Sequence, residues 1–150
     1  MSLSTHILAL LLAATAGLAM AVQGSLNAIL GKCTGIWVSM LIVHALATAT
    51  VLLTLLFWPP TRDGGLSRLL CAPWYAYLGG LIAVLITYGV IVTIPKLGVA
   101  TATTAIIVGQ VGTAAVIDHF GLFGLREVQF TLIKLFGVVL LAFGARLLLN

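Results

Sequence analysis

Apolar residues fill five long stretches of the chain, and short segments containing proline, glycine or charged residues separate them. Each stretch is close to the roughly 20 residues that a helix needs to cross the hydrocarbon core of a bilayer. The pattern therefore predicts an all-α membrane protein with five transmembrane helices. We expect a single domain, residues 1–150, with spans at about 7–30, 37–58, 74–94, 97–117 and 129–149. Pro95 and Lys96 are expected to form a tight turn between the third and fourth spans.

Small residues recur every three or four positions within these spans, which places them on one face of each helix. The pattern is clearest in the fourth span, at Gly98, Ala102, Ala105, Gly109 and Gly112. Small faces let membrane helices approach closely, because lipid provides no hydrophobic driving force between them. In the fifth span, Gly137 and Gly144 lie seven positions apart, and we predict that they form a dimer-packing surface.

A few polar side chains interrupt the apolar spans, where a polar group is costly unless it is paired or hydrated. We predict that these side chains line a path for substrate: Gln23, Asn27, His44, Tyr88, Gln110 and Thr113. Other roles remain open for some of them. The amides of the first span can instead join helices by hydrogen bonds, His44 can be paired structurally, and Tyr88 can be a packed aromatic residue.

Two titratable side chains are candidates for coupling transport to protons. His44 is one, because the ordinary pKa of histidine lies close to working pH. Asp118 is the other, at the expected membrane edge of the fourth span, although it can equally serve as a cap or a hydrogen-bond acceptor for the following loop. Neither Asp nor Glu lies in the middle of a predicted span.

The composition excludes several classes of protein. Hydrophobic residues make up 62% of the chain and charged residues only 7%, whereas soluble domains average about a quarter charged residues. The net charge of +4 comes from scattered basic residues, which does not indicate nucleic-acid binding. Cys33 and Cys71 fall in different predicted loops and form neither a metal pair nor a disulfide framework. We expect no metal, cofactor or enzymatic activity, because the chain lacks a nucleophile–base pair, a phosphate loop and paired carboxylates.

The distribution of basic residues barely distinguishes the two sides of the membrane. With five spans, the side of the N-terminus carries Arg62, Arg68, Arg126 and Lys134, and the other side carries Lys32, Lys96 and Arg146. Because orientation follows the excess of Lys and Arg in cytoplasmic loops, we predict that copies insert both ways and pair as an antiparallel homodimer. Such a pair has the inverted symmetry of many transporters. The alternative is a single orientation set by partner proteins or by subtle loop effects.

Several short motifs, taken in order, resemble the YdcZ-like family of short bacterial inner-membrane proteins in the drug/metabolite transporter superfamily. They are Gln23-x-x-x-Asn27-x-x-Leu30-Gly31, Trp74 to Gly80, Pro95 to Gly98, Gly109-Gln110, Ile117-Asp118-His119-Phe120-Gly121, and Gly137 with Gly144. The fourth-span motif around Asp118 is the most specific. His44 departs from some relatives.

The resemblance implies five spans and location in the bacterial inner (plasma) membrane. It also implies an antiparallel pair, formed either by two copies of the chain or by the chain and a paralogue. It also implies a secondary transporter. We therefore expect transport of a small polar or amphipathic solute by alternating access at the dimer interface. Small multidrug exporters of the same superfamily use a central membrane carboxylate, which this chain lacks. The alternatives are a passive channel and a non-transporting accessory subunit of the membrane.

Overall fold

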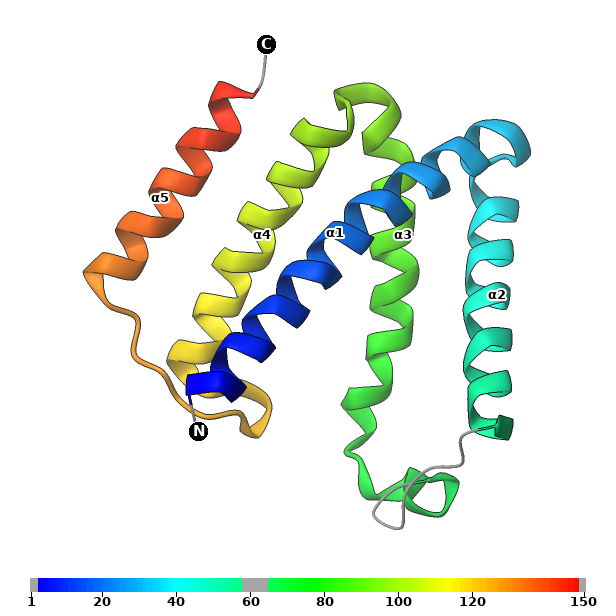
Figure 1. Cartoon of the computed structure of the whole chain (residues 1–150), viewed down its shortest axis with the longest axis horizontal. Coiled ribbons are helices and arrows are strands. Elements are labelled where there is room, and N and C mark those ends of the chain that lie inside the picture. Colours follow the sequence, from blue (N-terminus) through cyan, green and yellow to red (C-terminus); the bar gives the residue numbers. More distant parts are fainter. Residues whose placement is uncertain (1–2, 58–64, 149–150) are drawn as a thin grey trace. The chain divides into compact units, whose positions relative to one another are not determined.

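The computed structural model describes residues 3–57 and 65–148, and both ranges are helical, with no strand in either. Within these ranges, five α-helices and three short 3₁₀ helices follow one another (Figure 1). The α-helices are α1 (Leu3–Thr34), α2 (Ile36–Phe57), α3 (Leu78–Leu97), α4 (Val99–Phe120) and α5 (Leu132–Leu147). The 3₁₀ helices are η1 (Leu66–Cys71), η2 (Trp74–Tyr77) and η3 (Leu122–Gly124). The prediction of an all-α chain is confirmed.

Four helical segments are long and apolar enough to cross a membrane: Leu3–Thr34, Ile36–Phe57, Trp74–Leu97 and Val99–Phe120. The fifth helix, α5, has 16 residues and is therefore about 24 Å long, shorter than a hydrocarbon core of about 30 Å. It begins later than expected because Thr131 is its N-cap, and the Thr131 hydroxyl accepts a hydrogen bond from the Lys134 N–H at 3.4 Å. A membrane-spanning role for α5 stays a prediction.

The turn between α3 and α4 is not where we predicted it. Pro95 and Lys96 lie within α3, directly before its last residue, and the chain turns at Gly98, whose φ is +81°. A proline in the last turn of a helix removes a single hydrogen bond, whereas a positive φ is readily adopted only by glycine. The second span is predicted to end at Trp58, which lies outside the described residues together with Pro59 and Pro60. Within the described residues, α2 ends at Phe57.

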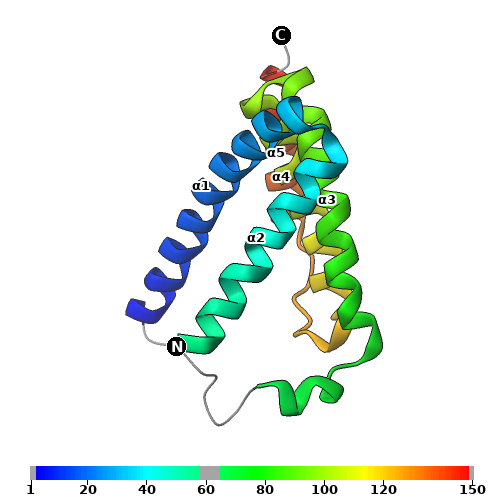
Figure 2. The same ribbon diagram turned by 90° about the vertical axis from the view of Figure 1, so that its right-hand side faces the viewer.

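The chain divides into two compact units, Met1–Val92 and Thr93–Asn150, which we describe separately. In the first unit, α1 and α2 form a hairpin that turns at Gly35 (φ +82°). The two helices are joined at this end (Figure 2) and diverge toward their other ends (Figure 1). The buried residues of these helices lie near the turn, at Gly24, Asn27 and Ala28 of α1 and at Ser39 and Met40 of α2.

Helix α3 joins this hairpin at Gly31, where the backbone of α1 meets the side chain of Ile91. A Cβ atom added at Gly31 lies 2.5 Å from Ile91 Cγ2 and 3.8 Å from Ser39 Oγ. Ser39 is fully buried, and its hydroxyl has no hydrogen-bond partner among the described residues. Glycine at position 31 therefore permits a close approach of three helices that a larger residue prevents.

In the second unit, α4 and α5 lie side by side and are antiparallel (Figure 1). Helix α4 ends at Gly121, which has the left-handed conformation (φ +56°, ψ +35°) suited to glycine. The chain then passes through η3 and returns past the end of α4, where the Val128 N–H donates to the Asp118 carbonyl at 2.7 Å. This return places the residues before α5 beside the last turns of α4.

Candidate functional site

The predicted site residues of the first unit differ in their exposure. Asn27 is buried, with 8% of its surface exposed, whereas Gln23, one turn earlier on α1, is exposed. His44 is half-buried, and its Nδ1 atom lies 2.8 Å from the Met40 carbonyl oxygen. Because a carbonyl can only accept, Nδ1 carries the proton and Nε2 is left as the acceptor of the neutral ring. His44 therefore retains one acceptor nitrogen for another group.

Tyr88 lies in a pocket between α2 and α3. Its ring centroid is 5.9 Å from that of Trp37, with an angle of 35° between the planes. The pocket has a volume of about 370 Å³ and is lined by Trp37, Met40, Leu81, Val84, Leu85 and Tyr88. Tyr88 thus both packs against an aromatic residue and faces an open apolar space, so both roles considered for it agree with this position.

Two predicted residues of the second unit, Gln110 and Thr113, are exposed on α4. Their side chains line neither of the two pockets between α4 and α5 that are described below. Neither Gln110 nor Gln23 makes a hydrogen bond to another residue in the described ranges. Each amide is therefore exposed and unpaired in the described ranges, within a helix that can span the membrane.

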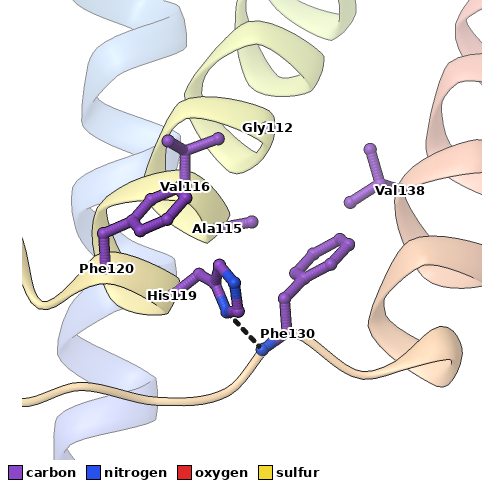
Figure 3. A pocket seen from close by; sticks show the side chains of 7 residues that line it. All are labelled: Gly112, Ala115, Val116, His119, Phe120, Phe130 and Val138. Carbon is purple, nitrogen blue, oxygen red and sulfur yellow. Dashed lines mark hydrogen bonds between the residues drawn. The ribbon is translucent and has the colours of Figure 1, made fainter.

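A group of aromatic side chains lies at the C-terminal end of α4. Figure 3 shows this pocket, with a volume of about 210 Å³, between α4 and α5. It is lined by Gly112, Ala115, Val116, His119, Phe120, Phe130 and Val138. The Phe130 N–H donates to His119 Nδ1 at 3.3 Å, and the rings of His119 and Phe120 meet edge-on at 4.8 Å. We call this space the aromatic pocket.

A second space adjoins the aromatic pocket and carries two opposite charges. It has a volume of about 330 Å³ and is lined by Val111, Ala114, Ala115, Asp118, Phe130, Lys134, Gly137 and Val138. The two spaces share Ala115, Phe130 and Val138. Consecutive helical residues diverge by about 100°, so Asp118 and His119 face different spaces. We call the second space the charged pocket.

Sequence reasoning found Asp118 but missed the other polar and aromatic residues of the aromatic and charged pockets. His119 and Phe120 belong to the motif that includes Asp118, and the motif is the only signal in the sequence that could have identified them. Phe130 and Lys134 carry no such signal, because they reach the charged pocket through the return of the chain after Gly121. Gly137 lines the charged pocket, and its predicted role with Gly144 in dimer packing stays a prediction.

The hydrogen bond between Phe130 and His119 predicts that His119 holds one wall of the aromatic pocket. A leucine at position 119 cannot accept a hydrogen bond, and a typical hydrogen bond contributes about 1 kcal/mol. We therefore expect the Phe130 amide to exchange about fivefold faster in His119→Leu than in the wild type. In His119→Asn the rate should stay close to that of the wild type, because the side-chain oxygen of asparagine also accepts.

Amide hydrogen exchange of the segment before α5, measured at one pH for the three proteins, tests this effect. Equal exchange rates in the wild type and in His119→Leu would contradict the role of His119.

No group of three or more His, Cys, Asp or Glu side chains in the described ranges is arranged to hold a metal ion. Cys33, in the last turn of α1, and Cys71, at the end of η1, are both exposed. The candidate site is therefore a set of pockets within each unit together with two exposed amides.

Comparison with known proteins identifies one family. A family model described as "Putative inner membrane exporter, YdcZ" matches residues 8–147. No curated protein and no solved structure matches the chain. The match covers all five α-helices except the first residues of α1.

Proposed function

Because the chain belongs to the YdcZ family of inner-membrane exporters, we propose that it is a secondary transporter that works as an antiparallel homodimer. The family and the four long apolar helices make it a multi-pass inner-membrane transporter. We propose that its substrate is a small polar or amphipathic solute, carried by alternating access at the dimer interface. A paralogue could take the place of the second copy.

The observation that carries the dimer proposal is the exposure of Gln23 and Gln110. Both amides lie within helices that can span the membrane, and neither is paired within its own unit. An unpaired amide in hydrocarbon costs several kcal/mol. A second copy, or a water-filled cleft between two copies, removes this cost.

An antiparallel pair also accounts for the weak bias in basic residues, because each copy then needs no preferred orientation. Transporters built as inverted repeats place the substrate site near the midplane, between the repeats. We propose that Gln23, Gln110 and Thr113 face this cleft. Asn27, His44 and Tyr88 support it from within the first unit, with His44 and Asp118 as candidates for proton coupling.

Counterflow in proteoliposomes tests transport. We expect that liposomes loaded with an excess of an unlabelled substrate take up the same labelled compound transiently, since alternating access couples the two directions. The measurement screens small amphipathic solutes one at a time and records saturation. Thr104→Val is the matched control for a cleft variant such as Gln110→Leu, because the Thr104 hydroxyl is bonded within its own helix to the Ala100 carbonyl at 2.8 Å.

The two other candidate functions give different results. A passive channel produces flux that neither saturates nor shows counterflow. An accessory subunit produces no flux for any solute, and variants such as Gln110→Leu then alter assembly alone. Either result excludes the proposed transporter.

A further inference from the structure

The charged pocket is a groove between α4 and α5 that carries Asp118 and Lys134, and Phe130 lines it together with small and aliphatic side chains. Ala115, Phe130 and Val138 also line the aromatic pocket. No ion pair joins Asp118 and Lys134 within the described ranges. Lys134 instead donates from Nζ to the Gln129 carbonyl at 3.1 Å, which leaves two of its three N–H donors unused.

Both charges lie at helix ends that oppose them. Asp118 is in the last turn of α4, where the helix dipole is negative, and Lys134 is in the first turn of α5, where it is positive. Neither charge is therefore explained by stabilisation of its own helix. For a bound ligand the contributions add: the end of α4 and Asp118 both attract a cation, and the start of α5 and Lys134 both attract an anion.

The charged pocket accommodates a ring beside Phe130. Its volume of about 330 Å³ exceeds the cavities of about 150 Å³ that hold benzene in proteins. Aromatic side chains favour offset or edge-on contacts with another ring. The hydrogen bond from the Phe130 backbone to His119 holds this wall of the pocket in place.

We propose that this groove, the charged pocket between α4 and α5, binds a zwitterion that carries an aromatic ring. Asp118 binds its ammonium group, Lys134 binds its carboxylate, and the ring lies against Phe130. This inference deepens the proposed function by naming a substrate class, and it gives Asp118 a binding role in place of a cap.

Four probes of related structure test the proposal. L-Phenylalanine has both charges and a ring, phenethylamine lacks the carboxylate, 3-phenylpropionate lacks the ammonium group, and L-alanine lacks the ring. We expect L-phenylalanine to bind the full-length protein in phosphatidylglycerol nanodiscs about tenfold more tightly than each of the other three. Isothermal titration calorimetry measures the four dissociation constants.

Two variants assign the charges. In Asp118→Asn, L-phenylalanine should lose its advantage over 3-phenylpropionate but keep its advantage over phenethylamine. In Lys134→Gln, the pattern should reverse. Lys96→Gln, which removes a cation near the end of α3, is the control and should change none of the affinities. Circular dichroism and elution volume establish that each variant is folded, and only folded variants enter the comparison.

Equal binding of the zwitterion and its single-charge analogues, or no binding, overturns the proposal. The same holds if both charge variants bind like the wild type. Loss of L-phenylalanine binding when phosphatidylethanolamine is added assigns the groove to a zwitterionic lipid headgroup and also overturns it. These results do not depend on transport: counterflow of another solute without L-phenylalanine binding refutes this inference alone, and binding without flux refutes the transporter alone.

Discussion

Replacing Gly31 with alanine is expected to destabilise the protein by about 1–3 kcal/mol, the usual cost of overpacking a close contact. The new Cβ lies 2.5 Å from Ile91 Cγ2, which is too short for two non-bonded carbon atoms. Ile91 is buried, and this methyl group is attached directly to its Cβ, so it cannot rotate away at low cost. The helix propensity that alanine gains, up to about 1 kcal/mol, does not offset this clash.

Thermal unfolding in detergent measures the effect, and Gly17→Ala is the matched control. Gly17 lies on the same helix, and a Cβ added there meets nothing within 4 Å. It should therefore leave the melting temperature unchanged or raise it slightly. The double variant Gly31→Ala with Ile91→Ala should be less destabilised than the two single changes predict, because the smaller side chain removes the clash. Additive effects would show that α1 and α3 do not meet at this point.

The helices of this protein follow from the apolar pattern of the sequence, but their ends depend on local chemistry. The run between Trp74 and Gly121 reads as two spans with a break near Pro95. Proline is the stronger signal in a sequence, yet Gly98 makes the turn because it alone provides the positive φ. At α5, the expected start at position 129 moves to Leu132 because the Thr131 hydroxyl caps the helix.

The candidate site could be predicted only where one helix determines it. The position of Gln110 in the middle of α4 and of Asp118 at its end can be read from the apolar pattern. Phe130 and Lys134 reach the same groove because the chain returns after Gly121 and because the Val128 N–H binds the Asp118 carbonyl. Such contacts between distant residues have no periodic signal, so sequence reasoning placed Lys134 only at the end of a span.

Replacing Gln110 with leucine is expected to raise the dissociation constant of the dimer by about tenfold, and combining it with Gln23→Leu should raise it further. Hydrogen bonds between polar side chains in membranes contribute about 0.6–2 kcal/mol each, and 1.4 kcal/mol corresponds to a factor of ten. The exposure of both amides in one copy is the reason to expect their loss to weaken association. Thr104→Val is the control and should leave the dissociation constant unchanged, since its hydroxyl is bonded within α4.

Energy transfer between dyes on the two exposed cysteines measures both the affinity and the orientation of the pair. In five-span copies, Cys33 and Cys71 of one copy face opposite sides of the membrane, so an antiparallel partner brings its Cys71 to the side of Cys33. Copies labelled only at Cys33 should therefore transfer energy more efficiently to copies labelled only at Cys71 than to each other. The opposite ranking would establish a parallel pair. Association that is unchanged in Gln110→Leu would place this amide outside the interface, and the substrate cleft would then need a different polar lining.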